Sequence, residues 1–133
     1  MTEHKPVLLA DDSDGNQVVG QGNNLNTDSN ANTVGGLEND LTNADSNTVN
    51  GARNILTDAD DNTVSGETNR VVSESDRNQV TGLSNVVRND SDNNTVSGTE
   101  NTVREADNNT VAGDGNRVVF GSDNNQTAGD DNL

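Results

Sequence analysis

A short pattern of polar and aliphatic positions recurs through almost the whole chain. The stretch from Asp92 to Ala106, DNNTVSGTENTVREA, holds two N-x-V triplets seven residues apart, with a Gly two residues after the first Val. Within each triplet, Asn and Val lie on one side and their neighbours on the other, which is the alternation of a β-strand. The frame repeats every 15 or 16 residues, and self-similarity at such a short period is typical of a solenoid.

Three positions fix the register of the repeat. The first Asn of each unit is Asn16, Asn32, Asn47, Asn62, Asn78, Asn94, Asn109 and Asn125. The Gly four residues later is Gly20, Gly36, Gly51, Gly66, Gly82, Gly98, Gly113 and Gly129. The second Asn is Asn23, Asn39, Asn54, Asn69, Asn85, Asn101, Asn116 and Asn132. Units that end in Ser have 16 residues and those that end in Ala have 15, so one corner absorbs the variation in length.

This register predicts an all-β fold, a parallel β-solenoid or two-sheet β-roll of about eight coils of 15 or 16 residues. We expect residues 1–6 to form a flexible tail, residues 7–13 an N-terminal capping half-coil, and residues 14–133 the solenoid repeats. Each Gly is expected at a corner that needs a positive φ or a close backbone approach.

The core predicted by this register is narrow. One sheet contributes Val18, Val34, Val49, Val64, Val80, Val96 and Val111, and the other contributes Leu25, Leu41, Leu56, Val71, Val87, Val103 and Val118. Burial of these small side chains is not enough to order the chain, so hydrogen bonds must add stability. We expect the two Asn rows to form internal ladders that bond to neighbouring coils or to the corner backbone.

Composition narrows the function classes. A content of 26% apolar residues with a net charge of -16 is typical of disorder, but the strict period favours a fold. The acidity argues against nucleic acid and anionic membranes as partners, and no stretch reads as a signal peptide or membrane span, so a cytoplasmic location is the default. With no Cys and only His4, we expect neither an enzyme nor a cofactor.

The two outward faces differ in charge. The sixteen outward positions of the first triplets, which run from Gln17 and Val19 to Gln126 and Ala128, include no charged residue. The second triplets carry Asp40, Arg70, Arg88, Arg104 and Arg117 at the equivalent positions. The uncharged face would present hydroxyl and methyl groups on a regular grid that could order water. The alternative is that Thr, Ser and Gln are ordinary outward strand residues.

The doubled N-x-V frame with its Gly, quoted above from Asp92 to Ala106, resembles the repeats of grass-type ice-binding proteins that inhibit ice recrystallisation. The resemblance covers about residues 14–133, and it implies a left-handed β-roll with one flat face of outward Thr, Ser and Val acting on ice. Ice or its surface water would then be the partner. By position, ice contact falls on Thr33, Thr48, Thr63, Ser65, Thr81, Thr95, Ser97 and Thr110.

Two other functions stay open. The C-terminal unit stops inside its second triplet, and exposed strand edges at solenoid ends favour end-to-end assembly into a homo-oligomer. Acidic residues also fall in two columns at one corner, among them Asp58 with Asp60 and Asp90 with Asp92. Stacked carboxylates could bind calcium and make a calcium-stabilised module, or they could be solvated turn residues, which we favour.

Overall fold

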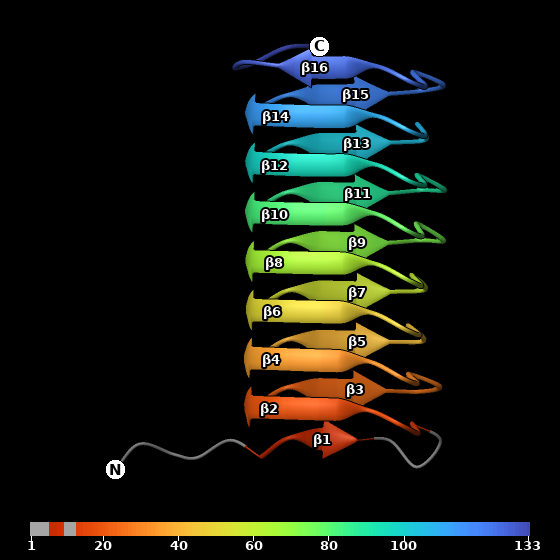
Figure 1. Ribbon diagram of the computed structural model, residues 1–133, viewed down its shortest axis with the longest axis vertical. Helices are drawn as coiled ribbons and strands as arrows, with labels where there is room; N and C mark the ends of the chain where they lie inside the picture. Colours follow the sequence, from red (N-terminus) through yellow and green to blue (C-terminus); the bar gives the residue numbers. More distant parts are fainter. Residues whose placement is uncertain (1–5, 10–12) are drawn as a thin grey trace.

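The computed structural model describes residues 6–9 and 13–133, which form an all-β solenoid of two parallel eight-stranded sheets (Figure 1). Sheet A contains β1 (Leu8–Leu9), β3 (Asn24–Asn26), β5 (Asp40–Thr42), β7 (Ile55–Thr57), β9 (Arg70–Val72), β11 (Val86–Arg88), β13 (Thr102–Arg104) and β15 (Arg117–Val119). Sheet B contains β2 (Gln17–Gln21), β4 (Thr33–Leu37), β6 (Thr48–Ala52), β8 (Thr63–Glu67), β10 (Gln79–Leu83), β12 (Thr95–Thr99), β14 (Thr110–Asp114) and β16 (Gln126–Ala128). Strands β2 to β15 make seven complete coils, which confirms the predicted fold class.

The register of the sheets is the register of the sequence repeat. Each strand pairs in parallel with the strand one coil further along the chain, so that Thr48 lies opposite Thr63 and Val49 opposite Val64. At the N-terminal end, β1 pairs with β3, and Leu9 lies opposite Leu25. The rest of the expected capping half-coil includes residues 10–12, which lie outside the described residues, as does most of the expected tail.

The core lies between the two sheets and is one side chain deep from each. All the predicted aliphatic residues from Leu25 to Val118 are buried, and Val18 is partly buried at the N-terminal end. The Ala that ends each 15-residue coil, such as Ala44, is buried as well. Because no larger side chain enters this space, the sheets approach closely along the whole stack.

Two ladders of buried Asn side chains confirm the predicted hydrogen bonding. In the second row, Nδ2 of Asn69 donates to Oδ1 of Asn54 at 3.1 Å and to the carbonyl of Gly82 at 2.9 Å. Its own Oδ1 accepts the backbone N–H of Asn85 at 3.0 Å. In the first row, the backbone N–H of Asn62 donates to Oδ1 of Asn47 at 2.8 Å. Each amide therefore bonds across coils and to the corner backbone, which satisfies groups that the thin core would leave unpaired.

The sheet B strands run further than the sequence predicts. The pattern places the Gly of each repeat at a corner after a short triplet, whereas β8 continues through Gly66 to Glu67. Gly66 has a φ of 117°, and a Cβ built there would lie 2.0 Å from the carbonyl oxygen of Gly82 in the next coil. The position thus meets both predicted requirements, positive φ and close approach, but inside a strand that keeps its pairing.

The corner after the sheet A strands holds the length variation, as predicted. Coils of 16 residues place two consecutive residues at positive φ there, such as Ser73 and Glu74, whereas coils of 15 residues place one, such as Glu105. In the longer coils the final Ser is also a cap: Oγ of Ser75 donates to the carbonyl of Val72 at 2.9 Å. The shorter coils have a buried Ala such as Ala106 at this position.

Candidate functional site

The outer surface of sheet B forms an uncharged face, which we call the neutral face. Its first column contains Gln17, Thr33, Thr48, Thr63, Gln79, Thr95, Thr110 and Gln126. Its second column contains Val19, Gly35, Asn50, Ser65, Thr81, Ser97, Ala112 and Ala128. Every residue of the first column is exposed, because the intervening Val of each triplet turns inward.

The eight residues predicted to contact ice all lie on this face. Thr33, Thr48 and Thr63 occupy consecutive strands in direct register. Gln79 interrupts the column before Thr95 and Thr110. The remaining three, in the second column, also lie on consecutive strands and are Ser65, Thr81 and Ser97. The structure therefore gathers the predicted residues into two adjacent columns.

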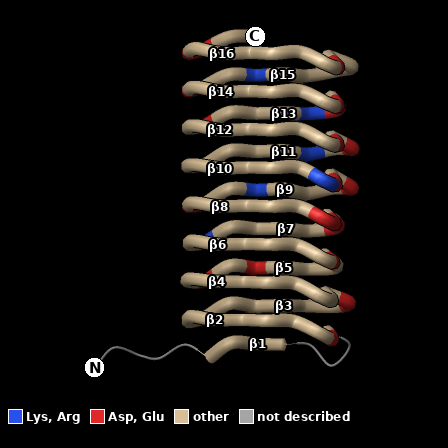
Figure 2. Tube along the Cα trace, viewed as in Figure 1, with Lys and Arg blue, Asp and Glu red and all other residues tan. Residues whose placement is uncertain are grey.

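The neutral face is a regular grid fixed by backbone hydrogen bonds. Neighbouring strands of a sheet lie about 4.8 Å apart, and alternate residues of a strand lie about 6.7 Å apart. Thr hydroxyl and methyl groups therefore repeat at fixed intervals in both directions. The charged residues of the sheet B strands are Glu67 and Asp114, which each follow the Gly of their strand, and Glu67 forms an ion pair with Arg53. In Figure 2 the middle of the sheet B strands carries neither acidic nor basic residues.

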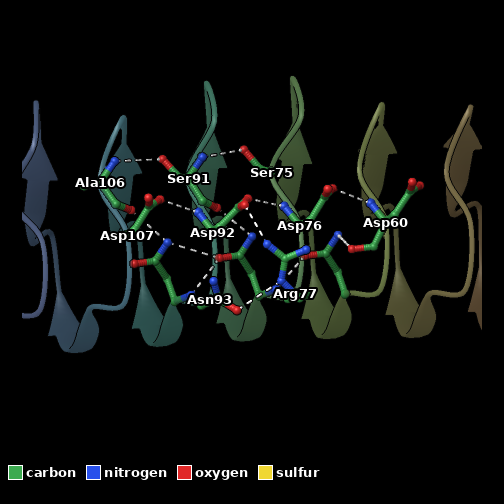
Figure 3. A network of polar contacts seen from close by, with 12 residues as sticks. Asp60, Ser75, Asp76, Arg77, Ser91, Asp92, Asn93, Ala106 and Asp107 are labelled. Atoms are coloured by element: carbon green, nitrogen blue, oxygen red, sulfur yellow. Dashed lines mark hydrogen bonds and ion pairs between the residues drawn. The ribbon is translucent and has the colours of Figure 1, made fainter.

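The acidic corner has a structural role that the sequence analysis missed. The column that begins each unit forms an unbroken ladder from Asp14 to Asp123, in which each backbone N–H donates to the side-chain Oδ1 of the next coil at 2.6 to 2.8 Å. Figure 3 shows part of this ladder, from Asp60 to Asp107, beside the bonds of Ser75 and Ser91. Arg77 adds a charged contact, because its guanidinium donates to Asp92 at 2.8 Å.

One residue in the column signals this role in the sequence. Asn30 replaces Asp and still accepts the N–H of Asp14 at 2.7 Å, because Asp and Asn share the Oδ1 acceptor. A column that tolerates this exchange needs the acceptor and not the charge. The bonds are directed from backbone donors to carboxylate oxygens, so these residues hold neighbouring coils together.

The two acidic columns enclose a shallow groove of about 270 Å³. It is lined by Asn43, Asp45, Asp58, Asp60, Glu74, Asp76, Asp90 and Asp92. Partial burial raises the pKa of Asp60; the N–H of Asp45 lowers that pKa, and the nearby carboxylates of Asp76, Asp45 and Asp61 raise it. Within the described ranges, no three acidic or His side chains are arranged to hold a metal ion.

Comparison with known proteins does not assign the chain to a family. No protein-family model matches the chain, and no curated protein matches it. Over residues 6–9 and 13–133, no helix has the length and apolar character needed to cross a membrane.

Proposed function

We propose that the neutral face binds ice and thereby inhibits ice recrystallisation. The observation that carries this proposal is the alignment of Thr33, Thr48 and Thr63 on consecutive strands of an exposed, uncharged sheet surface. A growing crystal presents a flat repeating surface, and a rigid protein surface with its own fixed repeat can engage many lattice sites together. The resemblance of the repeat to grass-type ice-binding proteins supports the same function.

The lack of charge supports the proposal further. A charged side chain holds its hydration water strongly, and removing that water for contact with a neutral surface is costly. Thr combines a hydroxyl that hydrogen-bonds water with a methyl group that water cannot bond, so a Thr column restrains the water above it without binding it as tightly as a charge does. The backbone ladders of sheet B hold this array in place before contact, which reduces the ordering cost of binding.

A charge-insertion experiment tests the proposal. We expect the triple variant Thr48→Lys, Thr63→Lys and Thr95→Lys to lose inhibition of ice recrystallisation in an assay of crystal growth in frozen sucrose. The matched control places the same three changes on the outer surface of sheet A, at Thr42, Thr57 and Thr102. Circular dichroism verifies that both variants keep the fold. Full inhibition by the sheet B variant, or equal loss in both variants, would reject the assignment to the neutral face.

A further inference from the structure

The outer surface of sheet A concentrates positive charge in an otherwise acidic chain. Arg70, Arg88, Arg104 and Arg117 come one from each of four consecutive strands, β9, β11, β13 and β15 (Figure 2). We call these four residues the arginine face. The sequence contains only seven Lys and Arg in total against 23 acidic residues, so more than half of the positive side chains lie on one surface.

The positions of the four arginines form a staggered row. Arg88 and Arg104 are direct partners in register on neighbouring strands. Arg70 and Arg117 lie in the other outward column, with Val86 and Thr102 between them. Three strand spacings of about 4.8 Å separate the first arginine from the last, so the row is about 14 Å long. Like charges this close repel one another unless an anion lies between them.

Most of this charge has no carboxylate partner. Among the described residues, the arginine face makes one salt bridge, between Arg104 and the adjacent Glu105 at 3.1 Å. The two arginines outside this face are paired differently: Arg53 with Glu67, and Arg77 with Asp92. Nε of Arg88 and Nε of Arg104 are buried without an acceptor. Arg53 and Arg77 are thus neutralised, whereas Arg70, Arg88 and Arg117 make no salt bridge in the part of the chain that the structure describes.

Apolar groups lie among these charges. The guanidinium of Arg104 stacks on the ring of Phe120 at 4.7 Å, and this ring, the one aromatic group of the sequence, is 60% exposed. Val72 occupies an outward position but is only 5% exposed and lies outside the main core. Val72 pairs in register with Arg88, so little of this valine is left for contact with a ligand. The surface offers anion-binding forks and one exposed aromatic ring.

We propose that the arginine face binds a segment of a linear anionic polysaccharide, one that carries sulfate or carboxylate groups along its chain. Guanidinium groups bind such oxyanions through two parallel hydrogen bonds, and a staggered row matches anions that repeat along a polymer. The CH groups of sugar rings can cover the exposed ring of Phe120. Since the surrounding surface is acidic, only the segment over the four strands is attracted.

Other occupants fit this surface less well. Single-stranded nucleic acid binds by stacking successive bases on several aromatic side chains, and this chain has one. A duplex is read by elements that enter its grooves, whereas a sheet surface is flat.

The test uses the full chain with heparin as the sulfated probe and polygalacturonate as the carboxylated probe. We expect at least one probe to bind at low salt, measured by titration calorimetry, with affinity that falls steeply as salt is raised. The variant Arg88→Gln with Arg104→Gln should bind about tenfold more weakly or worse, and its salt dependence should fall by about half because two of four charges are lost. The matched control, Arg53→Gln with Arg77→Gln, lowers the net charge equally and should bind as the parent does.

The proposal would be overturned by absence of binding to both probes at low salt, by equal weakening in the two variants, or by equally tight binding of a poly(dT) strand. Tight binding of inorganic sulfate alone would show a site for single ions, which also rejects a polymer. Arg70→Gln with Arg117→Gln, two exposed positions, provides a second weakened variant if the first one unfolds. All these variants should retain inhibition of ice recrystallisation, because the neutral face lies on the other sheet.

Discussion

Oδ1 of Asn69 accepts the backbone N–H of Asn85, one coil further along the chain, at 3.0 Å. Both side chains are fully buried, and Nδ2 of Asn69 donates in turn to Oδ1 of Asn54 and to the carbonyl of Gly82. The amide therefore links three consecutive coils through one side chain. Because the aliphatic core is thin, this internal polar row contributes a large part of the order of the fold.

Replacing Asn69 with Leu should destabilise the protein strongly. The change leaves the N–H of Asn85 buried without its acceptor, which costs about 1 to 3 kcal/mol. It also removes the hydrogen bonds from Nδ2 to Oδ1 of Asn54 and to the carbonyl of Gly82. We expect a loss of about 3 kcal/mol or more in chemical denaturation. The control is Asn50→Ser on the neutral face, where the next coil already has Ser65, and it should change the stability by less than about 0.5 kcal/mol. Similar stability of the two variants would contradict the role of the ladder.

Gly66→Ala should prevent normal stacking of the coils around it. The new Cβ would lie 2.0 Å from the carbonyl oxygen of Gly82, and that atom belongs to a backbone that cannot move without breaking strand pairing. We expect a large drop in the melting temperature, measured by circular dichroism. Gly121→Ala is the control, because a Cβ there meets no atom within 4 Å, although its φ of 69° carries a modest strain. Equal effects would show that the close approach is unimportant.

Asp60→Asn should stabilise the protein at neutral pH. The raised pKa of Asp60 means that the folded state binds this proton more strongly than the unfolded state, so ionisation of Asp60 opposes folding. The stabilising contribution of the protonated group is lost as pH rises through the folded pKa. Asn keeps the Oδ1 acceptor for Asp45, as Asn30 does for Asp14.

The measurement is urea denaturation of the parent and the variant across a pH series. The advantage of Asp60→Asn should be largest at neutral pH and should shrink as the parent carboxyl becomes protonated in acid. An advantage that is independent of pH would show that the effect does not come from the charge of Asp60. The control is Glu100→Gln, which removes one negative charge from an exposed side chain that does not contribute to the raised pKa of Asp60.

The corner after sheet A should accept a change of length. Deletion of Ser73 together with Ser75→Ala turns a 16-residue coil into the 15-residue form that ends in Glu105 and Ala106. We expect this variant to fold with a melting temperature within a few degrees of the parent, by circular dichroism. Deletion of Thr81 instead shifts part of β10 by one residue, which exchanges its inward and outward side chains, and it should unfold the protein.

The fold was predictable because the same positions of each repeat determine both the strands and their register. Asn and Val at fixed positions determine the inward side of each strand, and the same register then places Thr48 beside Thr63. The length of the sheet B strands was harder to predict, since the pattern alone does not show that pairing continues through Gly66. The Asp60 ladder was missed because a column of carboxylates suggests mutual repulsion, and the backbone donors that offset it become visible only in the folded chain.

The corner that alternates between Ser and Ala also separates two demands on the chain. Insertions and deletions at that corner change the length of a coil while the strands of both sheets keep their register. Evolution can therefore alter the corner chemistry without disturbing the spacing of Thr side chains on the opposite sheet. Within one coil, the corner thus accepts mutations, while the sheet B strand keeps the regular spacing.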